Sequence, residues 1–310
     1  MAVSHGFNLT EATTSVSAPV QVSSGLQIIV GTAPVNQLAN PAAAVNTPLY
    51  VSTYKEAVAA VGWSSDFAKY TLCEAISANF QVVGTAPIVV INVLDPKNKK
   101  HITALDETSV QVNDGVAEID KVGILLEKLV VKKDTTTLTA DVDYIASFND
   151  DGTVSLALII GGAGDGATTL NVSGSILDAS KVTADDIVGG VNAATGAETG
   201  LEVVRQVYPK LSKAPGILLA PRFSKNAQVC AALQAKCRKI NGLFNAVCFI
   251  DLDCSADGVQ KYTDVAEQKT KQTATSREAY ALWLYVKVGE TVYSGRSPGA
   301  AAPARNGRQD

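Results

Sequence analysis

The chain has 310 residues, of which 46% are hydrophobic and 18% are charged. This balance excludes a disordered composition and supplies apolar surface for a sizeable core, spread over about two domains. The net charge of −4 gives no indication of a nucleic-acid partner. No apolar run approaches the roughly 18 residues that a membrane helix needs, and the start of the chain lacks the pattern of a secretory signal. We therefore expect a soluble protein that is made in the cytoplasm and does not insert into a membrane.

Residues 1–24 are rich in Ser, Thr and Val and show no helical pattern. This composition predicts an extended N-terminal arm with β tendency. Such an arm can stay mobile, or it can add a strand to the sheet of another chain.

From residue 25 the chain alternates buried strands with helices. Residues 53–56 (TYKE) have the form of a capping box, in which Thr53 and Glu56 reach each other's free amides. The residues after it show helical spacing, and Gly62 is the signal that ends this predicted helix. The second predicted strand lacks polar alternation, which indicates that both of its faces are covered. The elements predicted here are strands at 26–30 and 88–94 and helices at 54–61 and 67–80.

The composition changes at residues 95–100 (DPKNKK) and then stays rich in Thr, Val, Asp and Gly. Residues 101–195 contain 15 acidic and 5 basic residues, a net charge of −10, so the remainder of the chain carries +6. Residues 149–152 (NDDG) are typical of a hairpin turn. We predict an acidic, all-β domain inserted over residues 97–195, with its carboxylates on a solvated outer surface. Its clearest strand-like runs are 128–132, 143–147 and 153–160.

The α/β pattern then resumes and completes a discontinuous domain made of residues 25–96 and 196–293. Alternation of strands and helices predicts an α/β fold with a mostly parallel sheet flanked by helices. The predicted strands are 216–220, 244–252 and 280–288, and the predicted helices are 201–208, 226–240 and 256–269.

The cysteines are odd in number and have no C-x-x-C spacing of the kind that zinc or redox sites use. Two of them are seven residues apart on a predicted helix and therefore share a face. Cysteine is often buried, and we interpret all of them as reduced core residues and expect no metal. The five are Cys73, Cys230, Cys237, Cys248 and Cys254.

Two glycine turns raise the question of nucleotide binding. Residues 161–168 (GGAGDGAT) match the glycine spacing of a phosphate loop, but Ala167 stands where that loop has its lysine, and a strand-like run follows. Residues 31–34 (GTAP) follow a buried strand but lack G-x-G-x-x-G, and Pro34 removes an amide donor. We interpret both segments as turns and expect no cofactor.

Asp251 and Asp253 alternate at the end of a predicted strand, which is where α/β enzymes place carboxylates. We interpret them as a helix cap with loop contacts. The two histidines are His5, in the arm, and His101, beside the domain junction. Catalysis by a histidine would need one of them to fold inward, and we expect no enzymatic activity. An α/β nucleotide-binding enzyme with a β insertion is the alternative.

Taken in order, these features resemble the tail sheath proteins of contractile-tailed phages and related injection machines. No single motif is unique to that family, but the order of the motifs around an inserted β domain is specific, and the likeness covers about residues 4–293. The matching segments are His5-Gly6 with Glu11, residues 22–34, 48–51 (PLYV), 54–61, 87–93 (PIVVINV), 195–201 (TGAETGL), 215–223 (PGILLAPRF) and 276–283 (SREAYALW).

The resemblance implies a structural subunit, found in the virion tail or in a contractile bacteriocin particle. Sheath proteins form a homo-oligomeric helical stack of rings around a tail tube, with baseplate and tail terminator proteins as further partners and no nucleic acid. Contraction of the stack drives the tube into a target cell. Their terminal arms pair as strands with sheets of neighbouring subunits. On this basis the arm residues expected at the subunit interface are Phe7, Leu9, Val16, Val20 and Val22.

Residues 294–310 depart from the family, which would continue with a further C-terminal domain and arm. This segment is rich in Ala, Pro, Gly and Arg, and we predict that it is disordered. Our hypothesis is a frameshifted or truncated end that lacks the usual C-terminal domain. A different self-assembling component, such as a capsid or surface-layer protein, is a further rival.

Overall fold

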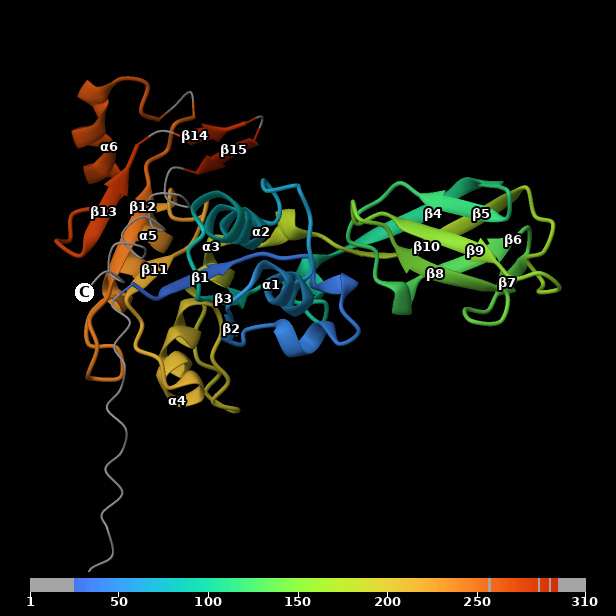
Figure 1. Cartoon of the computed structure of the whole chain (residues 1–310), viewed down its shortest axis with the longest axis horizontal. Helices are drawn as coiled ribbons and strands as arrows, with labels where there is room; N and C mark the ends of the chain where they lie inside the picture. Colours follow the sequence, from blue (N-terminus) through green and yellow to red (C-terminus); the bar gives the residue numbers. More distant parts are fainter. Residues whose placement is uncertain (1–24, 256–257, 284, 290, 295–310) are drawn as a thin grey trace, which may run out of the picture.

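The computed structural model describes residues 25–255, 258–283, 285–289 and 291–294. Two sheets follow one another along the long axis of the molecule (Figure 1). A six-stranded sheet with its helices lies at one end, and a seven-stranded sheet lies at the other. We call residues 102–177 the β module and the remaining described residues the main body.

The main sheet is built on strands that are buried along their whole length. The segments QIIVG of β1 and IVVIN of β3 are buried at every position, because helices cover both faces of the sheet. The strand order is β13-β12-β11-β1-β3-β2, with β2 antiparallel to β3 and the other neighbours parallel. The strands are β1 (Gln27–Gly31), β2 (Leu49–Val51), β3 (Ile88–Asn92), β11 (Ile217–Leu219), β12 (Val247–Asp251) and β13 (Ala279–Leu282).

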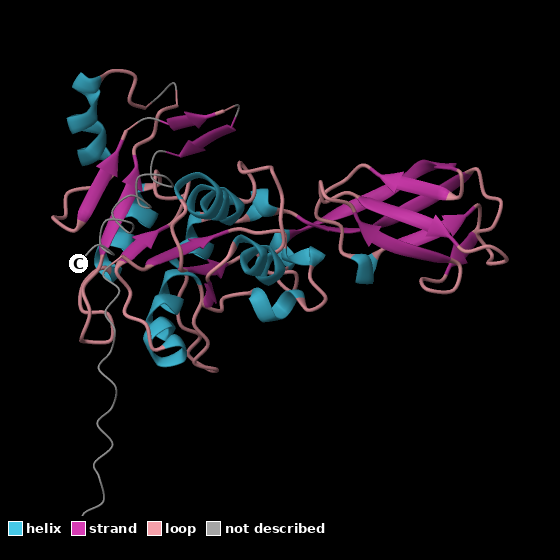
Figure 2. Ribbon diagram, viewed as in Figure 1, coloured by secondary structure: helices cyan, strands magenta, loops and turns pink. Residues whose placement is uncertain are grey.

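Helices surround this sheet, whereas the β module is almost entirely strand (Figure 2). The α-helices are α1 (Tyr54–Val61), α2 (Thr71–Ile76), α3 (Ala184–Val188), α4 (Val207–Leu211), α5 (Ala227–Lys236) and α6 (Val265–Lys271). In the described residues, no helix is long and apolar enough to cross a membrane.

Helix α1 begins and ends where the sequence indicates. The Thr53 hydroxyl accepts a hydrogen bond from the Glu56 amide at 3.2 Å. The Glu56 carboxylate accepts from the Ser52 amide at 2.8 Å, one residue before the amide expected of a capping box. Gly62 ends the helix with φ at 81°, and a Cβ there would lie 2.5 Å from the Pro34 carbonyl oxygen. Only glycine fits this combination of backbone angle and close approach.

Most predicted elements are shorter or shifted in the structure, and four of them differ most clearly. The helix expected over 67–80 starts at Thr71 and continues as a π-helical turn, Ser77–Val83. The helix expected over 201–208 is a 3-10 helix, Gly200–Gln206, followed by α4. The helix expected over 256–269 is the shorter α6; before it, Gly258 lies so close to the Asp253 carbonyl that a Cβ would be 2.1 Å from its oxygen. The strand expected over 280–288 divides into β13 and a separate hairpin, β14 (Tyr285–Val288) with β15 (Thr291–Ser294).

The β module is antiparallel throughout, with strand order β7-β6-β10-β4-β5-β9-β8. Most of its buried side chains, among them Val131, Leu156, Leu170 and Val172, form a hydrophobic core separate from that of the main body, whereas Leu125 and Leu177 pack into the core of the main body. The strands are β4 (Ile102–Asn113), β5 (Val116–Ile119), β6 (Val130–Lys133), β7 (Thr136–Leu138), β8 (Tyr144–Phe148), β9 (Val154–Leu158) and β10 (Thr169–Leu177).

The expectation of a mostly parallel sheet is therefore wrong for the chain as a whole. Among the strands that the structure describes, parallel pairs occur within the main sheet, while β2, the β14–β15 hairpin and the strands of the β module pair antiparallel. Helical crossovers are needed only between parallel strands, and short turns join the strands of the module. The fold is mixed α/β.

The domain limits stay a prediction, although packing bears on one of them. Ala179, Val182 and Ile187 follow β10 and lie in the hydrophobic core of the main body. We propose that the inserted domain ends near residue 178, earlier than the predicted limit at 195.

Candidate functional site

The arm residues predicted at the subunit interface lie outside the described residues, as do His5 and residues 295–310. The arm residues concerned are Phe7, Leu9, Val16, Val20 and Val22. Their strand exchange stays a prediction. The sites that the structure does place are the two glycine turns, the carboxyl edge of the main sheet, the cysteines and the junction between main body and β module.

The turn after β1 uses its own amides internally. The Thr32 amide donates to the Thr71 hydroxyl at 3.2 Å, and the Ala33 amide donates to the Asn92 side-chain oxygen at 3.0 Å. A Cβ on Gly31 would lie 2.3 Å from the Thr71 oxygen. A phosphate cradle needs free amides that point at the ligand. Thr71 and Asn92 occupy that place, so this turn acts as a packing feature.

The glycine-rich loop of the β module is held in the same way. The Gly161 amide donates to the Asp165 carboxylate, and the Ala163 amide donates to the Asp143 carboxylate, each at 2.8 Å. The Asp143 carboxylate also accepts from the Thr139 amide at 2.7 Å. These bonds from Thr139 and Ala163 lower the pKa of Asp143. Two carboxylates in the loop would repel a phosphate, so the geometry agrees with a surface turn.

The carboxyl edge of the main sheet is closed by polar side chains. Glu74 is 0% exposed, and its carboxylate pairs with the Arg222 guanidinium at 2.6 Å. The Arg222 amide donates to the Asp251 carboxylate at 3.1 Å, and the Ser224 hydroxyl accepts from the Asp251 amide at 2.9 Å. Ligands of α/β sheets bind at this edge where the strand order reverses, which here is between β1 and β11. The edge is filled by contacts within the chain.

Asp253 makes loop contacts, as predicted, but caps no described helix. Its carboxylate accepts from the amide and hydroxyl of Ser255, and its carbonyl accepts from the Val259 amide at 2.7 Å. Asp251 and Asp253 therefore serve different neighbours, and the structure does not bring them together on one substrate.

Four of the five cysteines are buried in the main body, as predicted, and Cys254 is half-buried. All five are free thiols. Burial raises the pKa of Cys73 to about 12, and contact with the Cys248 side chain raises the pKa of Cys237. Thiols kept protonated in this way are poor nucleophiles and poor metal ligands. Among the described residues, no group of three metal-ligating side chains occurs.

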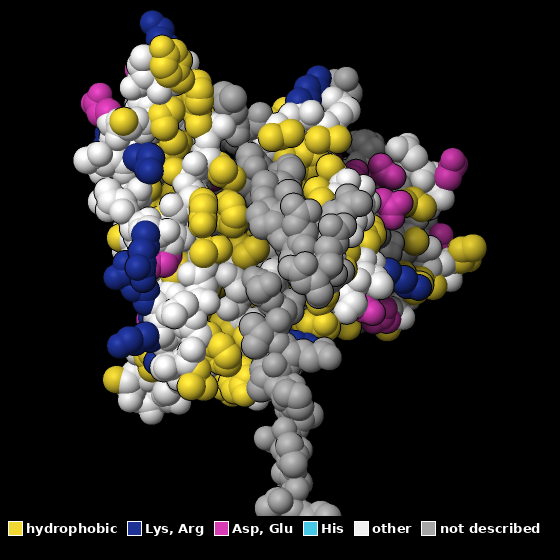
Figure 3. Space-filling model, turned by 60° about the vertical axis from the view of Figure 1, so that its left-hand side comes forward, with side chains coloured by type: hydrophobic (Ala, Val, Ile, Leu, Met, Phe, Trp, Pro, Cys, Tyr) yellow, Lys and Arg dark blue, Asp and Glu magenta, His cyan; other side chains and the backbone are white. Residues whose placement is uncertain are grey.

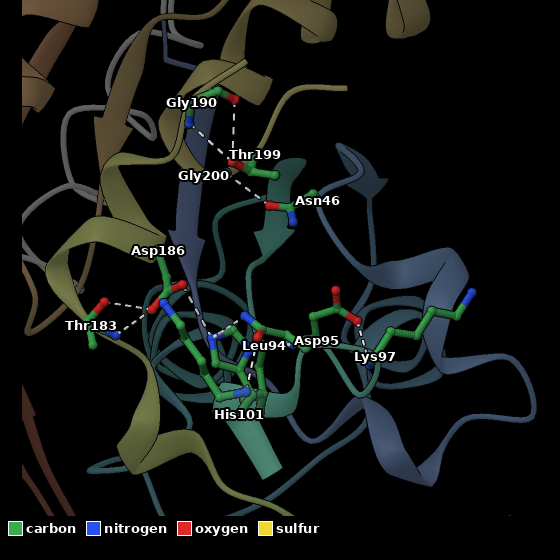
Figure 4. Close-up of polar contacts among 12 residues, drawn as sticks. Asn46, Leu94, Asp95, Lys97, His101, Thr183, Asp186, Gly190, Thr199 and Gly200 are labelled. Atoms are coloured by element: carbon green, nitrogen blue, oxygen red, sulfur yellow. Dashed lines mark hydrogen bonds and ion pairs between the residues drawn. The ribbon is translucent and has the colours of Figure 1, made fainter. Parts of the chain in front are cut away.

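His101 does fold inward, at the point where the chain leaves the main body for β4 (Figure 4). It is 2% exposed. Its Nδ1 accepts from the Asp95 amide at 3.0 Å, and its Nε2 lies 3.4 Å from the Asp186 carboxylate. Because Nδ1 accepts this hydrogen bond, Nε2 is the nitrogen that can donate to Asp186, and it also lies 3.3 Å from the Asn98 side-chain nitrogen. Both ring nitrogens thus hold the junction together.

The returning strand is tied to the same point. The Asp178 amide donates to the His101 carbonyl at 2.8 Å, and the Thr103 hydroxyl donates to the Asp178 carboxylate at 3.0 Å. Burial raises the pKa of Asp186, but hydrogen bonds from Thr183 and the neighbouring His101 outweigh it and lower the pKa overall. These bonds together fasten both segments of the chain that connect the main body to the β module. The sequence placed His101 at the junction, but nothing in its spacing indicated Asp186 as its partner.

Comparison with known proteins bears on the role of this architecture. No family model matches the chain. The tail sheath protein of Burkholderia phage BcepMu is 29% identical to it over 291 residues. The chain is similar to a tail sheath protein. The alignment covers 93% of this chain and 57% of the phage protein, so the chain spans little more than half the length of this relative. The resemblance to the sheath family that the order of motifs indicates is confirmed by this match.

Proposed function

We propose that this chain is a structural subunit of a contractile tail sheath. Copies polymerise as stacked rings around the tail tube, and contraction of the stack drives the tube through the envelope of the target cell. The tail tube, baseplate and tail terminator proteins are its partners. It works in the virion tail, after synthesis in the bacterial cytoplasm.

The observation that carries the proposal is the similarity to a phage tail sheath protein along 93% of the chain. The geometry supports a structural role, because the two glycine turns and the carboxyl edge of the sheet are filled by contacts within the chain. The alternative of a nucleotide-binding enzyme is not favoured.

Strand exchange between copies has a suitable place in the fold. In the described residues β14 and β15 form a two-stranded sheet of their own. The Tyr293 hydroxyl lies 3.0 Å from the Ser77 hydroxyl, and its ring lies 5.8 Å from that of Phe67, so β15 is anchored to the main body. Two-stranded sheets are marginally stable by themselves and gain from a third strand. We propose that the arm of a neighbouring copy supplies that strand.

Electron microscopy of the concentrated chain, with and without the tail tube protein of the same tail, tests the assembly. Rings or tube-bound stacks are expected. Deletion of residues 1–22 should abolish ordered assembly while the thermal unfolding midpoint of the monomer stays nearly unchanged. A chain that remains monomeric with the tube protein present contradicts the proposal.

A thermal-shift series with nucleotides tests the enzyme alternative. A nucleotide at 100 times its dissociation constant stabilises a protein by about 2.7 kcal/mol. No shift of that size is expected.

A further inference from the structure

A groove crosses the main body at the amino ends of its parallel strands. Its volume is about 740 Å³. The floor is apolar and is made by side chains that precede β11 and β12, among them Pro215, Phe244 and Ala246. The rim is charged and consists of Arg238, Lys239, Arg277 and Glu278.

The rim has an excess of positive charge. Glu278 pairs with Arg238 at 2.9 Å and with Arg277 at 3.0 Å, and these bonds hold its pKa far below the usual range. The rim thus has three cationic side chains and a single carboxylate. The Arg277 side chain is 90% exposed and is available to a partner. In Figure 3, which brings this end of the molecule forward, basic side chains recur down one side of the face.

The far tip of the β module has the opposite character. Ile160 is 92% exposed and Val142 is 62% exposed, although both are large apolar residues. They are close in space, because the next residue after Val142, Asp143, accepts through its carbonyl from the amide of Ile159 at 2.9 Å. This exposed apolar pair, bordered by polar groups, is the feature of the tip that a partner surface could cover.

Carboxylates surround that apolar pair. Asp141 and Asp165 lie in the same two loops and are exposed. The Lys133 ammonium donates to the Asp165 carbonyl at 2.7 Å, which brings the exposed Asp134 beside them. Within the described residues, no ion pair involves Asp134, Asp141 or Asp165. The tip is therefore an apolar knob bordered by three exposed carboxylates and the Lys133 ammonium, and we call this border, with its net negative charge, the acidic ring.

Groove and tip lie at opposite ends of the long axis of the molecule (Figure 1). They are complementary in both respects: apolar knob to apolar floor, and acidic ring to basic rim. A contact between different patches on identical subunits is heterologous, and it builds rings or open helical polymers rather than closed dimers. We propose that the tip of one copy, formed by Val142, Ile160 and their acidic neighbours, docks into the groove of the next copy.

The contact goes beyond arm exchange and rests on the proposed function only in that a sheath is a homopolymer. Ile160 would be its central anchor, since a few side chains buried near the centre of an interface carry most of its affinity. The charged ring would set orientation and association rate, and would make the contact sensitive to salt.

Sedimentation velocity of the whole chain at low and high salt is the primary measurement. Association should be strongest at low salt. Ile160→Ser should weaken it about tenfold or more. The matched control is Val130→Ser, an exposed apolar residue on β6 of the same module, which should leave association unchanged.

The decisive experiment reverses the charge of the groove in one variant and the charge of the tip in another. Variant one carries Lys239→Glu and Arg277→Glu in the groove, and variant two carries Asp134→Lys and Asp141→Lys at the tip. Each alone should stay monomeric, because like charges then face each other. An equimolar mixture should associate, because each variant offers the other an opposite charge. Asp134 and Asp141 have positive φ values of 54° and 63°, so Asp134→Asn with Asp141→Asn separates lost charge from strained backbone.

The mixing result also covers variants that fold poorly, because a misfolded variant cannot be rescued by its partner. Loss of association without rescue on mixing, in variants whose circular dichroism and thermal unfolding midpoint match the wild type, overturns the inference, as does a wild-type chain that stays monomeric at low salt. If rings form around the tube and none of these substitutions changes them, the tip-to-groove contact is wrong and the proposed sheath function stands.

Discussion

The main body and the β module solve the same problem of burial in different ways. Strands β1 and β3 are buried at every position, since helices lie on both faces. In the module, β5 alternates exposed and buried positions, because only one face meets the core. An uninterrupted apolar run thus indicates a strand whose two faces are both covered, and an alternating run indicates a strand covered on one face. The rule is the same for parallel and antiparallel strands.

The two regions also differ in which polar and reactive side chains they contain. All five cysteines belong to the main body, whereas carboxylates dominate the module. Asp114, Asp134 and Asp141 adopt left-handed backbone conformations in turns, and Asp143 accepts two backbone amides. The acidity of the module is thus more than a solvated surface, because part of it builds the turns.

Core substitutions should separate the two regions most clearly. Leu156 is 0% exposed in the core of the module, and Leu156→Ala should destabilise the module by about 2–5 kcal/mol. Both tryptophans, Trp63 and Trp283, belong to the main body. Urea unfolding followed by tryptophan fluorescence should therefore stay unchanged, while the far-UV circular dichroism loses a strand component at lower urea.

The matched variant is Ile29→Ala, at an equally buried position on β1. It should shift the tryptophan transition by a similar free energy. If Leu156→Ala moves both probes together, the module and the main body unfold as one cooperative unit, and the proposed division into domains fails.

A smaller effect is expected at the turn after β1. Gly31→Ala places a Cβ 2.3 Å from the Thr71 oxygen, so the turn must shift and the main body should lose about 1–3 kcal/mol. Gly190→Ala is the control, because a Cβ there meets nothing within 4 Å. Urea midpoints from tryptophan fluorescence measure both variants. Equal midpoints would show that the contact between Gly31 and Thr71 gives way without cost.

Local patterns predicted the fold well where one interaction decides the outcome. The buried runs that became β1, β3 and β11, the Asn149–Gly152 hairpin turn and the Gly62 helix stop were predicted from the residues alone. Each depends on hydrophobic burial or on backbone angles that few residues allow.

Prediction failed where distant segments decide the outcome. The partner of the buried Glu74 is 148 residues away, at Arg222. The partners of the Gly31 turn, Thr71 and Asn92, are likewise remote in sequence. Spacing along one chain carries no information about such pairs, so the sequence indicated that the turn lacked a nucleotide motif but not what fills it.

The smallest expected effect is a loss of stability at acidic pH that is confined to the β module. Backbone bonds from Thr139 and Ala163 lower the pKa of Asp143 below its ordinary value of 3.8. Between the two pKa values the unfolded chain binds more protons, so stability rises with pH there. The contribution of Asp143 is fully present above about pH 4 and is lost as pH falls through the lower pKa of the folded state.

Hydrogen exchange of peptides covering residues 136–165, measured from pH 5 to pH 2.5 and corrected for intrinsic rates, tests this dependence. In the wild type, protection of the 139–165 loops should fall at the acid end. Asp143→Asn should reduce protection at pH 5 and flatten the acid dependence, because the charged acceptor is gone at every pH. Asp150→Asn, at an exposed carboxylate of the neighbouring hairpin, should keep the wild-type profile. If Asp143→Asn also keeps it, the glycine-rich loop is held by its backbone turns, and the carboxylate of Asp143 contributes nothing to holding it.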